Sequence, residues 1–144
     1  MDENSDLLTI TVSKDAIHDF ITYLKEDPSL QFGFLTDLTG IHYPEQELPL
    51  GVIYHLHNMR ENKRLRVKTF VPLEDTAVKT VTDLFSSANW MERETFDFYG
   101  ILFAGHPNLK RILNVEYMDY FPMRKEYPLE DQTREDKDDR FFGR

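Results

Sequence analysis

Cysteine is absent from all 144 residues, and so are long apolar runs and any excess of positive charge. Without thiols the chain cannot form a disulfide, ligate an iron–sulfur cluster through thiolates or use a cysteine nucleophile. No stretch approaches the roughly 18 consecutive apolar residues of a membrane span, and the acidic start MDENSDLL is unlike a signal peptide. A net charge of −9 repels phosphate backbones and anionic lipids. We therefore expect protein partners, in a reducing compartment, and no nucleic acid.

Recognisable cofactor motifs are missing as well. The sequence contains neither GxGxxG nor GxxxxGK[ST], the glycine-rich patterns that bring backbone N–H groups to a pyrophosphate or nucleotide phosphate. The composition, 40% hydrophobic and 13% aromatic, is that of a folded domain. At 144 residues the chain has the usual size of one domain with a single core.

The hydrophobic pattern predicts one α+β unit. Alternation of apolar and polar residues predicts strands over 7–12, 32–43, 51–59 and 65–71. The charged turn RENK joins the last two strands as an antiparallel hairpin. Apolar residues at helical spacing predict helices from Ser13, as N-cap, to Glu26, over 77–88, and over 90–99.

These elements indicate a small, mostly antiparallel sheet with helices packed on one face, followed by an irregular extended C-terminal arm. We place the globular α+β domain at residues 1–115 and the arm at residues 116–144.

The helix over 90–99 carries the most specific local signals. Asn89 and Glu92 have the three-residue offset of a capping box. Gly100 stands where a C′ glycine would end the helix. Arg93 and Asp97, four residues apart, are expected to pair on its surface.

A Gly-His-Pro turn follows this helix. Gly105 permits the turn, and Pro107 pushes His106 toward extended geometry. A histidine here can titrate near neutral pH, so an independent small enzyme using His106 with Glu92 or Asp97 is one hypothesis. A structural role for His106 fits better, because neither Ser nor Cys stands nearby to complete a nucleophilic arrangement.

Two further pairs can be weighed as sites. Glu92 and Glu94 point about 200° apart on a helix, so they do not converge on one substrate. His55 and His57 share one face of a predicted strand and could chelate a metal. No third ligand stands at recognisable spacing, and a solvated strand face is the simpler interpretation.

The segment 92–113 resembles the signature of one family of respiratory complex I subunits, the 30 kDa subunit family of NADH:quinone oxidoreductase. The residues that carry the resemblance are Glu92, Arg93, Glu94, Asp97, Gly100, Ile101, Phe103, Gly105, His106, Pro107, Leu109, Arg111, Ile112 and Leu113. Downstream, FPMRKEYPLED is similar to the Pro-Leu-Arg-Lys-Asp-Tyr-Pro-Leu element of the family, with Met123 and Glu126 as departures. His42 stands where the family more usually has Asp, and the acidic tail from Gln132 has no match.

The resemblance implies a non-catalytic structural subunit of the peripheral arm of NADH:quinone oxidoreductase (complex I). Its expected partner is the hydrogenase-like subunit of that arm, and it supports electron transfer from NADH to quinone coupled to proton translocation. In that family flavin and iron–sulfur clusters belong to partner subunits, so no cofactor and no metal is expected in this chain. The implied location is peripheral, on the cytoplasmic side of the cell inner membrane. An equivalent subunit of a membrane-bound hydrogenase or of a ferredoxin- or plastoquinone-linked complex is the alternative.

The segment 119–131 predicts where the partner binds. Its two prolines block a regular helix or central strand, and its aromatic residues lack a period that would bury them in this domain. We expect it to run extended across the partner protein. The predicted interface residues are Tyr120, Phe121, Arg124, Lys125 and Tyr127.

Overall fold

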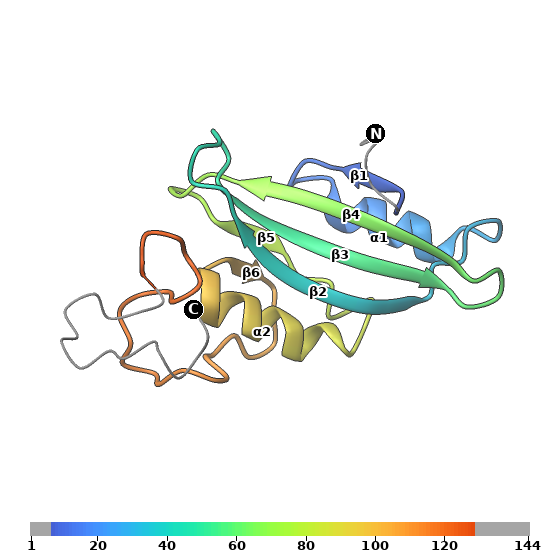
Figure 1. Ribbon diagram of the computed structural model, residues 1–144. Helices are drawn as coiled ribbons and strands as arrows, with labels where there is room; N and C mark the ends of the chain where they lie inside the picture. Colours follow the sequence, from blue (N-terminus) through green and yellow to red (C-terminus); the bar gives the residue numbers. More distant parts are fainter. Residues whose placement is uncertain (1–6, 129–144) are drawn as a thin grey trace, which may run out of the picture.

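A computed structural model describes residues 7–128, and its frame is a four-stranded sheet in the order β1-β4-β3-β2 (Figure 1). The strands are β1 (Thr9–Thr11), β2 (Phe34–His42), β3 (Leu50–Asn58) and β4 (Lys63–Val71). β2, β3 and β4 form an antiparallel meander that includes the predicted hairpin, whereas β1 runs parallel to β4. The predicted α+β class is confirmed, with a sheet that is mixed because of β1.

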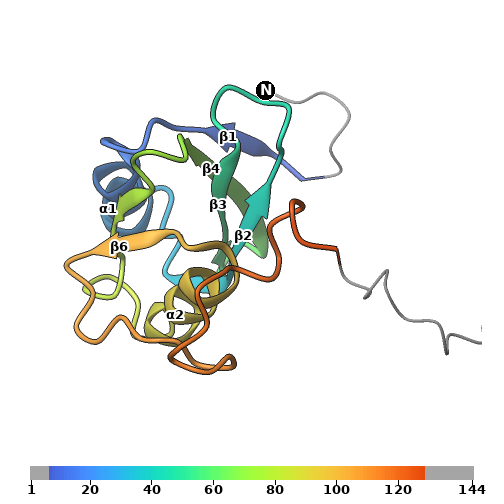
Figure 2. The same ribbon diagram turned by 90° about the vertical axis from the view of Figure 1, so that its left-hand side faces the viewer.

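Both helices cover the same face of this sheet, as Figure 2 shows. They are α1 (Ile17–Glu26) and α2 (Ala88–Tyr99). Alternate residues of β3 from Leu50 to Leu56 are buried beneath them, as are Ile17 and Ile21 of α1. Every second side chain of the strand and one side of α1 are thus buried against each other, and together they form one core.

The helix predicted over 77–88 is wrong. Residues Ala77–Lys79 form β5, which pairs in parallel with β6 (Leu102–Ala104) as a separate two-stranded sheet. Val78 lies opposite Phe103, and both are buried. A single turn, in which the N–H groups of Leu84 and Phe85 donate to the Val81 carbonyl, then leads into α2. Apolar residues at helical spacing therefore reach the core through a strand and a turn.

The predicted N-caps are also wrong. α1 begins at Ile17 after Ala16 rather than after Ser13, and α2 begins at Ala88, two residues before the predicted start at Trp90. Neither helix has a side-chain cap hydrogen bond. The C-terminal prediction is confirmed, because Gly100 ends α2 in the left-handed conformation, at φ 72°.

The end of α2 packs closely on Gly40 of β2. A Cβ atom at Gly40 would lie only 2.3–2.8 Å from three ring atoms of Tyr99. Such distances are far inside van der Waals contact, so Gly40 is what allows the end of α2 to lie on the edge strand.

We predict that Gly40→Ala destabilises the fold by about 1–3 kcal/mol, because the added methyl displaces the Tyr99 ring. Gly33→Ala is the matched control, since a Cβ there meets only the Gln31 carbonyl oxygen, at 3.9 Å. Urea unfolding of both variants measures the difference. If Gly40→Ala unfolds at the same midpoint as Gly33→Ala, the close packing of Tyr99 on β2 is wrong.

Candidate functional site

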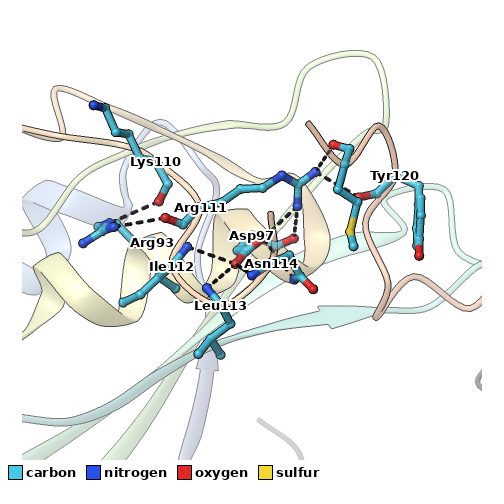
Figure 3. A network of polar contacts seen from close by, with 9 residues as sticks. Arg93, Asp97, Lys110, Arg111, Ile112, Leu113, Asn114 and Tyr120 are labelled. Carbon is cyan, nitrogen blue, oxygen red and sulfur yellow. Dashed lines mark hydrogen bonds and ion pairs between the residues drawn. The ribbon is translucent and has the colours of Figure 1, made fainter. Parts of the chain in front are cut away.

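The signature residues meet at the side chain of Asp97, which is fully buried. Its Oδ2 accepts hydrogen bonds from the backbone N–H groups of Ile112 (3.0 Å), Leu113 (2.8 Å) and Asn114 (2.9 Å). Its Oδ1 accepts from Arg111 Nη1 at 2.7 Å and from the Asn114 side-chain amide at 3.1 Å (Figure 3). One carboxylate thus holds four consecutive residues of a segment without regular structure.

Arg111 extends this network toward the C-terminal arm. Its side chain is 7% exposed and forms an ion pair with Asp97. Its Nη2 donates to the carbonyl oxygens of Met118 (2.7 Å) and Tyr120 (2.9 Å). The guanidinium therefore ties α2 to the arm by using several of its donors at once.

The predicted surface pair of Arg93 with Asp97 is wrong. Arg93 instead donates to the carbonyl oxygens of Lys110 (3.1 Å) and Arg111 (3.0 Å), on the other side of the same loop. Asp97 faces inward, because its hydrogen bonds to the loop outweigh a solvent-exposed pair four residues away.

The protonation of Asp97 follows from these contacts. Burial alone would raise its pKa, but hydrogen bonds from the Asn114 backbone, the Arg111 side chain and the backbones of Leu113 and Ile112 hold it well below its usual range. Asp97 is therefore an anion at neutral pH whose acceptor positions are occupied, and it has no role as a proton donor there.

Glu92 forms a second buried network. It is fully buried, and its carboxylate accepts from Thr80 Oγ1 (2.5 Å) and from the Val81 N–H (2.8 Å). The predicted capping box with Asn89 is therefore wrong. Burial raises the pKa of Glu92 to about 7, although its two hydrogen bonds act against this rise. Glu94 is exposed, so the two glutamates do not converge.

His106 is held in one orientation by backbone groups on both sides. Its Nε2 lies 3.1 Å from the Asn89 carbonyl oxygen, and its Nδ1 accepts from the Asn108 N–H at 3.0 Å. Because Nδ1 accepts, Nε2 carries a proton that it can donate to the Asn89 carbonyl oxygen. Gly105, at φ 86°, makes the turn that sequence pattern predicted.

The structure does not assemble the catalytic group considered for an independent enzyme. Within residues 7–128, no hydrogen bond or ion pair joins His106 to Glu92 or Asp97, because each is bonded to other groups. None of the three lines the cavity of about 740 Å³ that lies between the end of β2 and the arm. Convergent geometry is the first requirement for acid–base catalysis, so this hypothesis loses its structural support.

The predicted histidine pair lies on one face of β3, but its members are bonded separately. His55 Nε2 accepts from Arg66 Nε at 2.9 Å, and its Nδ1 lies 3.4 Å from Asp37. His57 Nε2 lies 3.0 Å from the Asn62 side-chain oxygen. In the described part of the chain, no three His, Cys, Asp or Glu side chains are grouped in a way that could hold a metal ion.

The arm, as far as residue 128, is irregular but packs on its own domain. Phe121 contacts Phe96 edge-to-face, with ring centroids 6.3 Å apart, and lies under the guanidinium groups of Arg111 (5.1 Å) and Arg124 (4.7 Å). Arg124 Nε donates to the Tyr99 carbonyl oxygen at 2.7 Å. Two of the five predicted interface residues, Phe121 and Arg124, are thus packed within this chain, and a third, Lys125, holds its Nζ 5.8 Å from the Tyr43 ring centroid. Residues 129–144 lie outside the described part.

His42 anchors the arm from the sheet, a role that sequence reasoning missed. It is 4% exposed at the end of β2, and its Nδ1 accepts from the Lys125 N–H at 3.0 Å. Burial lowers the pKa of His42, against the raising effect of Glu126. The sequence held one indication of this role, because the alternation of buried and exposed residues in β2 turns the His42 side chain inward.

A cavity of about 740 Å³ lies between the end of β2 and the arm. Tyr99 forms part of it, and its other lining residues are Ile41, His42, Tyr43, Pro122, Met123, Arg124, Lys125, Tyr127 and Pro128. The ring of Tyr127 contacts that of Tyr120 in a tilted arrangement, with centroids 5.1 Å apart, and both side chains remain more than a third exposed. Aromatic surface with a few polar groups is typical of a site that accepts side chains of another molecule.

Comparisons with known proteins agree with the signature. The family model described as respiratory-chain NADH dehydrogenase, 30 Kd subunit, matches residues 10–133. The C subunits of NADH-quinone oxidoreductase from Parvibaculum lavamentivorans and Paramagnetospirillum magneticum are 43% and 45% identical over 122 residues, or 85% of this chain. The chain spans 60% and 61% of the length of these relatives.

Solved structures show the same fold. A trypsin-resistant fragment of Nqo5 aligns with a TM-score of 0.67 at 31% identity, over 76% of this chain and 87% of that one. A chain of the membrane-bound sulfane sulfur reductase, an archaeal respiratory membrane complex, aligns with a TM-score of 0.74 at 27% identity. That alignment covers 90% of this chain and 76% of the other.

We predict that Asp97→Asn destabilises the protein by about 3–5 kcal/mol at neutral pH, because it leaves Arg111 buried without a counter-charge and places an amide NH₂ against backbone donors. The pKa of Asp97 is lower in the folded state, so this stabilisation is complete above about pH 4, the unfolded value, and is lost as the pH falls. Unfolding of the variant and of Asp15→Asn, an exposed control, at pH 7 and pH 3 measures it. Equal stability of the two variants at pH 7 would contradict the assignment.

For Glu92 the change of stability with pH has the opposite sign. Its pKa rises from 4.5 to about 7 on folding, so the wild-type protein loses roughly 3 kcal/mol as the pH increases from 4.5 through 7. Glu92→Gln keeps one acceptor and one donor and should remove this loss, whereas Glu94→Gln should leave it unchanged. The measurement is urea unfolding at pH 5 and pH 8. A wild-type protein and a Glu92→Gln variant with the same pH dependence would show that Glu92 ionises normally.

Proposed function

The chain belongs to the 30 kDa subunit family of respiratory-chain NADH dehydrogenase, and on that basis we propose that it is a structural subunit in the peripheral arm of an NADH–quinone oxidoreductase. In this role it performs no chemistry of its own. It holds the quinone-reducing module together while electrons pass from NADH to quinone in other subunits, a transfer that the complex couples to proton translocation.

The networks around Asp97, Glu92 and His106 support this role. Their polar groups already have partners within the chain, so they fix shape and leave little capacity to bind a substrate. We assign the flavin and the iron–sulfur clusters to partner subunits, in keeping with a chain that has no cysteine.

The observation that carries the proposal is the apolar surface of the segment 112–127. Seven of the fifteen large hydrophobic side chains that are exposed within residues 7–128 lie in this segment. They are Ile112, Leu113, Val115, Tyr117, Tyr120, Met123 and Tyr127. Apolar exposure concentrated in one segment marks a protein interface, and this segment is held rigidly through Arg111.

We infer that the hydrogenase-like subunit of the complex is the partner that covers this surface. Tyr120, Tyr127 and Lys125 are exposed and can contact it, although Lys125 also lies over the Tyr43 ring, whereas Phe121 and Arg124 shape the surface from below. Neither helix of the described residues is long and apolar enough to cross a membrane. We propose that the chain is held peripherally, on the cytoplasmic side of the inner membrane, through contacts with other subunits.

One observation favours a second candidate. The similarity to a chain of the sulfane sulfur reductase shows that this fold also occurs in a related respiratory membrane complex. An equivalent subunit of a complex with another electron donor, such as a membrane-bound hydrogenase or a ferredoxin-linked complex, would use the same surface. The presence or absence of a flavin-bearing NADH-oxidising subunit in the purified complex separates the two.

We predict that replacing both exposed tyrosines, Tyr120→Ser with Tyr127→Ser, lowers recovery of the hydrogenase-like subunit with the tagged protein at least about tenfold, because aromatic anchors carry much of the energy of an interface. The protein is purified from cells that express the whole complex. Tyr23→Ser, on the exposed side of α1 and 55% exposed, is the control.

Undiminished recovery with the double variant would place the interface elsewhere on the domain. Failure of the wild-type protein to co-purify with any subunit of an NADH–quinone oxidoreductase would contradict the proposed function itself.

A further inference from the structure

The face of the four-stranded sheet opposite the helices carries side chains of a distinct kind. Leu65 and Val67 of β4 are buried under the helices, so the residues that alternate with them point to the other face. From β4 these are Arg64, Arg66 and Lys68, which we call the basic row. Figure 2 shows that both helices lie on the opposite side.

The strands next to the basic row bring little negative charge. His57 and His55 of β3 lie opposite Arg64 and Arg66, and Ile53 lies opposite Lys68. On the other side of the row, Thr9 and Thr11 of β1 lie opposite Arg66 and Lys68. Within residues 7–128, the carboxylate that these strands place on this face is Asp37 of β2, which lies opposite His55. In a chain with a net charge of −9, three cations and one carboxylate among the described residues make this face a local exception.

Asp37 already has a partner within the chain. Its carboxylate lies 3.4 Å from His55 Nδ1, and His55 Nε2 accepts a hydrogen bond from Arg66 Nε. Arg64 and Lys68 have no ion pair and no side-chain hydrogen bond to any residue of the described part.

Such an arrangement costs the isolated domain free energy. Like charges on neighbouring positions of one sheet face repel, and each gains when a carboxylate approaches. Phe34 lies on the same face opposite His57 and is 49% exposed, and Arg64 also borders a cavity of about 210 Å³. Arginine beside an exposed aromatic ring is the composition that protein interfaces favour.

We propose that the basic row, with Phe34, is a second docking surface, and that its occupant is an acidic segment of another protein subunit. The choice of a protein over a nucleic acid or an anionic membrane follows from charge. An extended polyanion would also meet the rest of this acidic chain, whereas a short acidic segment meets only the basic row. The proposal rests on the proposed function in one respect, that the acidic subunit belongs to the same complex.

Lys68 provides a direct test, because carbodiimide joins a lysine amine to a carboxylate with no spacer. The intact complex is treated with carbodiimide and digested, and the cross-linked peptides are identified by mass spectrometry. We expect Lys68 to be linked to an Asp or Glu of another subunit. If Lys68 is linked only to residues of its own chain, or forms no cross-link, the proposal is overturned.

Charge reversal supplies the second measurement. Arg64→Glu with Lys68→Glu should lower recovery of the cross-linked partner about tenfold or more, and added salt should weaken the wild-type contact in the same direction. Lys79→Glu, an exposed strand residue of β5, is the matched control. Circular dichroism of the purified variants confirms folding before recovery is compared.

The outcomes also distinguish this proposal from the proposed function. If the wild-type protein co-purifies with the complex but the double charge reversal recovers every subunit as the control does, the basic row is a solvated face. If the charge reversal instead abolishes binding to vesicles containing anionic lipid or to single-stranded DNA and leaves recovery of the other subunits unchanged, the occupant is not a protein.

Discussion

The ion pair and hydrogen bonds of Asp97 are the constraint on which the shape of the segment 111–120 depends. Residues 105–128 contain no helix or strand, so their backbone groups need partners from elsewhere. Asp97 supplies acceptors to Arg111 and to the three N–H groups that follow it, and Arg111 passes the constraint on to Met118 and Tyr120. A buried charge is costly unless it is fully paired, and here full pairing turns an irregular segment into a defined surface.

This full pairing explains why the richest motif in the sequence is not an active site. Glu92, Asp97 and His106 are residue types that catalysis uses, yet each is bonded to protein groups that fix its protonation or orientation. Carboxylates with an unoccupied oxygen facing a cavity would argue for chemistry. Here the carboxylates have all their hydrogen-bond partners within the chain and lie beneath an exposed apolar segment. This arrangement favours a role in binding other subunits, which is the function proposed for the chain.

Sequence pattern predicted the sheet well because each long strand buries one face, so Leu50 to Leu56 alternate cleanly. It also located Gly100, whose left-handed conformation is a local requirement. It failed for 77–88 and for Asp97, where the decisive partners lie far along the chain: Phe103 for Val78, and residues 14 to 17 positions away for Asp97. Rules for residues three or four apart cannot see such contacts, and tertiary structure overrides them.

Hydrogen exchange of the backbone amides of Ile112, Leu113 and Asn114 tests the central role of Asp97 most directly. These amides belong to no helix or strand, so an unsupported loop would exchange them within seconds. Because Asp97 accepts from all three, we expect protection comparable to that of the amides in the middle of α2. In Asp97→Asn we expect protection to be lost at all three positions together. Rapid exchange in the wild-type protein, at the rate of an exposed loop, would contradict it.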